Sequence, residues 1–236
     1  MNLILLHDSD FISSSTAVLK DRRFHHIRTV QQPVAGDQLK VGRINGKLGT
    51  GLVLEITDNQ IRLEVRCNTT PPPPLPLTLI LALPRPKMLK RILQTCATMG
   101  VKQLYLINSY RVDKSYWSSP VLTRQIEEHL MLGLEQAGDT LMPEVHLRKR
   151  FKPFVEDELP GLADGSSALL AHPYEASPCP APQMRPTTLV VGPEGGFIPY
   201  EVDKLNMCGF TTIHIGERIL RVETAIPALL SRLFPL

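Results

Sequence analysis

The stretch LTLILALPRPKMLKRILQTCATMGVKQLYLI, residues Leu77 to Ile107, decides the fold class of this chain. Its first part, Leu77–Leu83, is a continuous apolar run of strand length, which is typical of a parallel strand covered on both faces. Apolar residues then recur at helical spacing from Met88 to Met99, Gly100 stops that pattern, and Val101–Ile107 has the character of a second strand. The strand–helix–strand order predicts an α/β domain with a mostly parallel sheet.

The same alternation continues after this stretch. Further helices are expected near Thr123–Gln136 and over roughly Tyr200–Met207 and Thr224–Phe234. Further strands are expected near Val145–Leu147 and at Ala168–Ala171, Thr188–Val191 and Thr212–Ile215.

The residues before the stretch follow a different pattern, in which apolar and charged residues alternate in short segments. A half-buried antiparallel sheet is expected from Gln38–Ile44, Leu48–Thr57 and Ile61–Cys67, and together with Leu3–Leu6 it suggests a small β-barrel. Asn45-Gly46 favours a type I′ turn between the first two strands, because both residues tolerate the positive φ that this turn needs.

A proline cluster separates the two patterns. Pro71–Pro74 and Pro76 cannot join the interior of a sheet or continue a helix, so they predict a stiff linker. We expect a β-barrel domain at residues 1–70, a Pro-rich linker at 71–76 and an α/β domain at 77–236.

Composition excludes several classes of protein. Of the 236 residues, 43% are hydrophobic and 21% are charged, which is ordinary globular usage and excludes a disordered or fibrous chain. The longest apolar run near the start, Leu3–Leu6, is too short for a signal peptide or a membrane span, so we expect a cytoplasmic protein with no membrane partner. The net charge of +3 permits a polyanionic partner without requiring one.

The cysteines and histidines carry no metal signature. The four cysteines lie far apart without a CxxC pair, and His25-His26 lacks a nearby third ligand. We therefore expect neither a disulfide framework nor a metal site.

Three predicted strands lead into segments that contain glycine or proline, and these exits form the candidate binding site. In open α/β sheets, ligands bind outside the carboxyl ends of the strands. The exits are His172–Tyr174, Gly192–Phe197 (GPEGGF) and Gly216–Arg221 (GERILR). GPEGGF matches neither GxGxxG nor the P-loop pattern, so a nucleotide-phosphate loop is disfavoured and an ordinary strand-to-helix turn is the simpler alternative.

Charged residues follow the last of these strands. Arg218 and Arg221 precede Glu223 and Thr224. One interpretation is a helix entrance, in which Thr224 is the N-cap and Glu223 suits the helix dipole. The functional interpretation is that the Arg221 guanidinium stabilises negative charge on a substrate oxygen.

Two ordered motifs in this region carry a family resemblance. GPEGGF at Gly192–Phe197, followed by IGERILRVETA at Ile215–Ala225, resembles the paired signature of the SPOUT class of methyltransferases. More narrowly, the chain resembles the RsmE family, which methylates N3 of a uridine in small-subunit ribosomal RNA. LILALPRPKMLKRILQTCATMGV resembles the first strand and helix of that family's catalytic domain, LLAHPY its first cofactor strand exit, and HHIRTVQQPVAGDQL its N-terminal PUA-like barrel.

The resemblance implies a fold, a cofactor and an assembly. The catalytic domain would be a SPOUT-type domain with a deep trefoil knot, and S-adenosylmethionine (SAM) would bind in a bent conformation, held mainly by backbone groups of the three strand exits. A homodimer would form, with both subunits needed for an active site. The RNA partner would be ribosomal RNA or the small ribosomal subunit.

The resemblance also implies roles for individual residues. The residues around the cofactor would be Leu170, His172, Pro173, Gly192, Glu194, Gly195, Gly196, Ile215, Gly216, Ile219 and Leu220. Arg221, Glu223 and Thr224 would face the methyl donor and the target base. Arg221 would stabilise charge on the uracil oxygens, and Glu223 would either orient that arginine or accept the imide proton.

Three positions depart from the family pattern. No arginine occurs in Met1–Phe11, Gln31 or Gln32 stands where arginine is common, and Asp139 stands where arginine is expected. Each change removes positive charge from an expected RNA-facing position. Two alternatives follow: a non-catalytic RNA-binding or ribosome-assembly protein on the same fold, and a methyltransferase with a different RNA target. A dinucleotide-dependent oxidoreductase is disfavoured because GxGxxG is absent.

Overall fold

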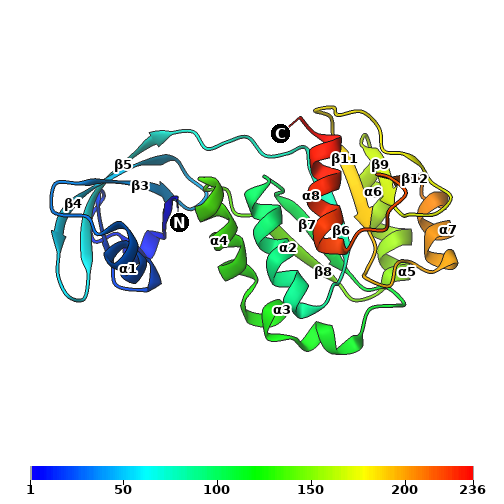
Figure 1. The fold of residues 1–236 in the computed structure, drawn as a ribbon, viewed down its shortest axis with the longest axis horizontal. Coiled ribbons are helices and arrows are strands. Elements are labelled where there is room, and N and C mark those ends of the chain that lie inside the picture. The colour runs from blue at the N-terminus through cyan, green and yellow to red at the C-terminus, as the bar shows by residue number, and fades with distance from the viewer. Residues whose placement is uncertain (1, 236) are drawn as a thin grey trace. The chain divides into compact units, whose positions relative to one another are not determined.

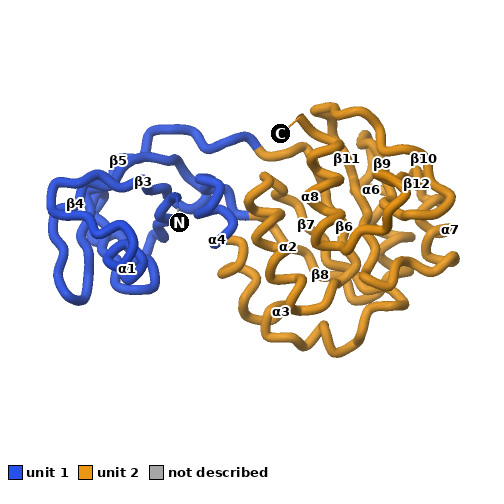
Figure 2. The backbone as a smooth tube through the Cα atoms, viewed as in Figure 1, with its two compact units in different colours: residues 1–73, 131–142 blue, residues 74–130, 143–236 orange. Residues whose placement is uncertain are grey.

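The computed structural model describes residues 2–235 and divides into two compact units (Figure 2). Unit 1 comprises residues 1–73 and 131–142, and unit 2 comprises residues 74–130 and 143–236. Residues 131–142, which the sequence places in the α/β domain, therefore group with the N-terminal part. The backbone N–H groups of Asn2 and Leu3 both donate to the Glu135 carbonyl at 3.0 Å, and the Arg22 guanidinium forms an ion pair with the Glu135 carboxylate at 3.0 Å.

Unit 1 contains a five-stranded sheet with the order β1-β3-β4-β5-β2. The strands are β1 (Ile4–Leu6), β2 (Thr16–Leu19), β3 (Gln38–Arg43), β4 (Leu48–Ile56) and β5 (Ile61–Thr69). β1 pairs with β3 in parallel, and the other neighbours are antiparallel. The helical segments are η1 (Asp8–Asp10), α1 (Arg22–His26) and η2 (Ile27–Gln31).

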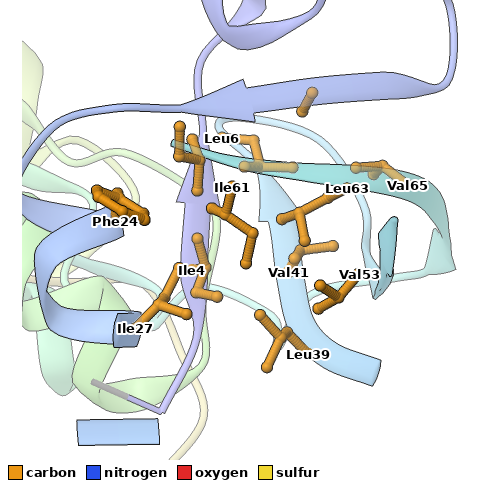
Figure 3. Packing of buried hydrophobic residues seen from close by; sticks show 12 residues of the cluster. Ile4, Leu6, Phe24, Ile27, Leu39, Val41, Val53, Ile61, Leu63 and Val65 are labelled. Atoms are coloured by element: carbon orange, nitrogen blue, oxygen red, sulfur yellow. The ribbon is translucent and has the colours of Figure 1, made fainter. Parts of the chain in front are cut away.

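The core of unit 1 lies on one face of this sheet. Alternate residues of β3 and β5, such as Val41, Ile61 and Leu63, point into it and are fully buried (Figure 3). Phe24 and Ile27 close the cluster from α1 and η2. The alternating pattern of the sequence therefore identified the buried face of the sheet correctly.

The turn between β3 and β4 differs from the expected type I′ turn. Asn45 has a φ of 56°, whereas Gly46 does not adopt a positive φ, so the prediction is wrong. Thr140, from the 131–142 segment, is hydrogen-bonded to this turn. The Asn45 N–H donates to the Thr140 carbonyl at 2.8 Å, and the Thr140 hydroxyl donates to the Gly46 carbonyl at 2.5 Å. The turn is shaped by this distant segment and not by its own two residues.

Asp139 does not face solvent as an RNA contact would. Only 4% of its surface is exposed, and its carboxylate accepts the N–H of Leu141 at 3.0 Å. The expectation of an RNA-facing position is therefore wrong for Asp139, because residues 131–142 pack within unit 1. Gln31 and Gln32 are exposed, as expected.

Unit 2 is an α/β unit around a seven-stranded sheet, which confirms the predicted fold class. The order is β10-β12-β9-β11-β6-β7-β8, and every paired neighbour is parallel. The strands are β6 (Leu77–Ala82), β7 (Gln103–Ile107), β8 (Glu144–Arg148), β9 (Ser167–Ala171), β10 (Ser177–Pro178), β11 (Thr187–Val191) and β12 (Thr211–His214). All five residues of the central strand β11 are buried, including Thr187 and Thr188, and Leu189–Val191 form its apolar run.

Helices connect these strands. They are α2 (Pro86–Thr98), α3 (Pro120–Arg124), α4 (Ile126–Ala137), α5 (Phe151–Pro153), α6 (Leu159–Ala163), α7 (Pro199–Met207) and α8 (Val222–Leu233), with the 3-10 segment η3 (Lys114–Ser118) and the π-helical segment η4 (Phe154–Glu158). α2 and α8 pack side by side in front of the sheet (Figure 1). Within residues 2–235, no helix is long and apolar enough to cross a lipid bilayer.

Candidate functional site

The carboxyl ends of the parallel strands meet at one edge of the sheet in unit 2, and a cavity opens there. Residues that follow β12, β9, β11, β6 and β7 all contribute to its lining. The cavity has a volume of about 1140 Å³. Its position is the one that strand topology favours for a ligand.

Most of the site residues expected from the sequence line this cavity. They are His172, Pro173, Gly192, Glu194, Gly195, Gly196, Ile215, Gly216, Ile219, Leu220, Arg221 and Glu223. The three separate strand exits are thus brought together by the sheet order, in which β9 lies between β12 and β11.

Two of the expected residues are not part of the lining. Leu170 is fully buried inside β9, opposite Val190 and Thr212 of the neighbouring strands. Thr224 is exposed in the first turn of α8, where its N–H donates to the Arg221 carbonyl at 2.9 Å. Arg221 is the N-cap of this helix, so the expectation that Thr224 is the cap is also wrong.

The lining includes residues that the sequence did not indicate. Arg85, Lys87 and Met88 follow β6, and Arg111 follows β7. The strands that precede them were predicted, but no local pattern in the sequence indicates that β6 pairs with β11. Glu175, Asp203 and Asn206 also line the cavity without having been indicated, whereas Tyr174 and Arg218 belong to the exits that were identified.

The GPEGGF loop is tied to the exits of β6 and β7. The Glu194 carboxylate accepts the backbone N–H of Arg85 at 2.9 Å, at the start of α2. The Arg111 guanidinium donates to the Gly195 carbonyl. Gly196 has a φ of +72°, a conformation that favours glycine, and its N–H closes a turn onto the Pro193 carbonyl at 2.8 Å. These contacts hold the loop in one shape at the cavity wall.

A buried carboxylate, that of Glu201, holds the segment that follows the GPEGGF loop at the start of α7. Glu201 in α7 is only 3% exposed. Its two oxygens accept the backbone N–H of Tyr110 at 2.8 Å and that of Ile198 at 3.1 Å. Glu201 therefore joins the start of α7 to the loop after β7, and it satisfies a helix-terminal N–H that would otherwise lack a partner.

The cavity carries charges of both signs. The cations are Arg85, Lys87, Arg111, Arg218 and Arg221, and the carboxylates are Glu175, Glu194, Asp203 and Glu223. Among the described residues, no ion pair within 4.0 Å joins any two of these groups. The charged groups can therefore interact with a ligand without first breaking an internal ion pair.

His172 lines the cavity, and its surroundings shift the pKa of its imidazole ring. Partial burial lowers the pKa of this imidazole, and the nearby Glu175 carboxylate opposes that effect. The neutral ring is therefore favoured at neutral pH.

Comparison with known proteins places the chain among RNA-modifying enzymes. Residues 71–234 match the model of the RNA methyltransferase domain family. The chain is 26% identical to the ribosomal RNA small subunit methyltransferase E of Treponema pallidum over 95% of this chain and 87% of that protein. It is 28% identical to the ribosomal RNA small subunit methyltransferase E 1 of Borreliella burgdorferi over 60% of this chain and 59% of that protein.

A solved structure shares the fold. The ribosomal RNA small subunit methyltransferase E of Neisseria gonorrhoeae, bound to S-adenosyl methionine, superposes with a TM-score of 0.77. The two chains are 21% identical, and the match covers 97% of this chain and 96% of the other.

Proposed function

Because the chain belongs to the RNA methyltransferase domain family, we propose that it transfers the methyl group of SAM to N3 of a uridine in small-subunit ribosomal RNA. The observation that carries the proposal is the cavity at which five strand exits meet, with the GPEGGF loop at its wall. The names of the Treponema and Borreliella relatives support the ribosomal substrate.

The residues of the cavity fit the chemical groups of SAM. Gly216 has a φ of +145°, and a Cβ there would meet no atom within 4 Å, so its backbone borders open space. Ile215, Ile219 and Leu220 offer apolar surface for an adenine ring. The carboxylates of the lining suit a sulfonium and an ammonium group, and the arginines suit a carboxylate. When bound, SAM supplies an electrophilic methyl group on its sulfonium centre.

Arg221 is placed to stabilise charge on the substrate. Its carbonyl accepts the N–H groups of Thr224 and Ala225, at 2.9 and 2.7 Å, so its backbone is fixed at the start of α8 while its side chain is exposed in the cavity. Loss of the imide proton of uracil leaves negative charge that is shared between N3 and the two carbonyl oxygens. A guanidinium at this position would stabilise that charge as it develops.

Glu223 is the candidate to orient Arg221 or to hold the imide proton. It lines the cavity two residues after Arg221, and its carboxylate forms no ion pair with Arg221 in the part of the chain that the structure describes. The target base must lie outside a base-paired stack to reach these groups.

The finer expectations belong to the same proposal. Unit 1 would be a PUA-like barrel that adds RNA affinity, the C-terminal part of unit 2 would thread as a trefoil knot, and two copies would form a homodimer. The apolar stripe of α8, at Ile226, Leu229, Leu230 and Leu233, is buried inside unit 2 and does not support a dimer interface. The homodimer therefore rests on the family resemblance.

Calorimetric titration of the full chain with SAM, followed by methylation of small ribosomal subunits, tests the proposal. We expect SAM binding and the appearance of N3-methyluridine. A folded protein that binds RNA but not SAM would support the non-catalytic alternative instead.

A further inference from the structure

The exits of β6, β7 and β8 carry a row of cations that the expected cofactor segments do not include. We propose that this row binds the backbone of a single-stranded RNA segment beside the target base. The row, called here the basic track, consists of Arg85, Lys87, Arg111, Lys149 and Arg150. The inference rests on the proposed function for the identity of the nucleic acid and deepens it by assigning a substrate-binding surface to unit 2.

The sheet places the three exits next to one another. β6, β7 and β8 are adjacent parallel strands, so their carboxyl ends share one edge. The Leu83 N–H donates to the Ile107 carbonyl at 2.9 Å, and the Asn108 N–H donates to the Arg148 carbonyl at 2.9 Å. These bonds keep the exits in register, and three strands at the usual spacing span about 10 Å.

Cations predominate in the three exit segments themselves, although the Glu194 carboxylate of the neighbouring GPEGGF loop accepts the Arg85 N–H at 2.9 Å. Residues 84–88, 108–112 and 148–152 contain two, one and four cations respectively, and no Asp or Glu occurs in them. Arg148 is engaged in an ion pair with Glu158 at 2.6 Å, but none of the ion pairs in residues 2–235 involves a member of the basic track. All five members are exposed. Such a row provides the electrostatic attraction that phosphates require.

The basic track extends from the cavity to the end of β8, the edge strand of the sheet. Arg85, Lys87 and Arg111 line the cavity, whereas Lys149 and Arg150 lie outside its lining and follow the edge strand β8. RNA bound along the track would therefore lead from the sheet edge to the cavity in which the proposed chemistry occurs.

Aromatic rings lie among the cations. Tyr110, directly before Arg111, is 78% exposed, although its ring is large and partly apolar. The Trp117 indole N–H donates to the Asn108 side-chain oxygen at 3.0 Å, and the Lys149 ammonium lies 5.9 Å from the centre of the Trp117 ring. An exposed aromatic ring among cations is typical of single-strand binding, because an unpaired base can stack on it. Tyr110 meets this condition, whereas Trp117 is half-buried.

A salt-dependence experiment tests the electrostatic part of the proposal. Binding of a fluorescent oligouridine to the full chain is measured at several salt concentrations, for wild type and for Lys149→Ala/Arg150→Ala. Each lost phosphate contact lowers the slope of log K against log[salt] by about 0.7 for a single strand, so we expect a fall of about 1.4. The matched control Arg91→Ala/Arg185→Ala removes two exposed charges outside the track and should keep the wild-type slope. Lys149→Arg/Arg150→Lys keeps both charges and should restore the slope.

Tyr110→Ala tests the stacking part. Because no charge changes, the salt slope should remain while affinity falls about 5- to 150-fold, the range for loss of one stacked base. Wild-type affinity in this variant would overturn the stacking role of Tyr110.

Affinity for SAM, measured by calorimetry on the same proteins, separates this inference from the proposed function. An unchanged slope in Lys149→Ala/Arg150→Ala, or an equal fall in the control, would overturn the track even if the wild type methylates RNA. A wild type that fails to bind SAM but shows the expected slopes would retain the track and overturn the proposed function.

Discussion

Arg221 is the residue on which the proposed chemistry depends most. Its interaction with the uracil oxygens would be realised mainly in the transition state, so Arg221→Ala should lower turnover far more than it weakens SAM binding. Loss of one such donor costs on the order of 10²-fold or more in rate. Arg221→Lys should recover little, because an ammonium lacks the planar fork of the guanidinium.

Single-turnover methylation beside thermal melting distinguishes this role from a structural one. Arg221 also forms the N-cap of α8 through its backbone, which the substitution leaves in place. A variant that melts early but methylates at the wild-type rate would end the catalytic assignment.

Glu201 is a second residue whose side chain can be tested by a single substitution, here through the stability of the fold. In Glu201→Ala, the N–H groups of Tyr110 and Ile198 lose their acceptor, and each of these partly buried hydrogen bonds contributes about 0.5–1.5 kcal/mol. We expect urea unfolding to show a clear loss of stability, while the exposed Glu127→Ala serves as a control within ±0.5 kcal/mol or so of wild type. Equal stability of the two variants would show that these hydrogen bonds contribute little.

The GPEGGF loop is the element whose shape should control cofactor affinity. Gly196→Val places a β-branched side chain at a φ of +72°, where the nearest other atom to a Cβ is 4.0 Å away. The Cβ itself has room, so the expected cost is the backbone strain of a β-branched residue at positive φ, typically about 1–3 kcal/mol. We expect SAM binding to be lost in calorimetry. Gly161→Ala, at a position with open space and no positive φ, should bind SAM normally, and undiminished affinity of a folded Gly196→Val would remove the loop from the pocket.

Strands and helices with a clear periodicity of apolar residues could be predicted from the sequence, whereas elements without one could not. β6, β7, β9 and β11 were predicted because most of their residues are apolar, as buried parallel strands require. β12 was predicted from the short segment Thr212–Ile215. β2, at Thr16–Leu19, is short and follows a run of serines, and the helical stretch from Phe151 to Ala163 contains Pro153 and Pro160, so neither showed a clear period.

The site was predictable to the extent that it follows strand ends. Three exits were identified because glycine and proline mark them. Arg85 and Arg111 were missed because their place depends on the sheet order, in which β6 pairs with β11 and β7 pairs with β6. No local sequence pattern reveals this order. Leu170 lies inside β9, one residue before that strand ends at Ala171, and Thr224 lies in the first turn of α8, well after β12 ends at His214.

At the scale of the whole molecule, the two units cannot be separated by one cut in the chain. A chain that begins at residue 74 retains residues 131–142 but loses Asn2, Leu3 and Arg22, which bind Glu135. Leu134 in this segment is fully buried in the intact chain. We expect the truncated chain to melt earlier and to bind more of a hydrophobic dye than the full chain. Equal melting temperatures and dye binding would show that the segment is stable without residues 1–73.

The proposed reaction is tested most directly by mapping the transferred methyl group. The full chain is incubated with isotopically labelled SAM and small ribosomal subunits that lack the modification, and the RNA is digested and examined by mass spectrometry. We expect the label in N3-methyluridine at one position, and its near absence with Arg221→Ala. A label on another atom or another class of base, or no transfer by a wild-type protein that binds both SAM and RNA, would contradict the assignment.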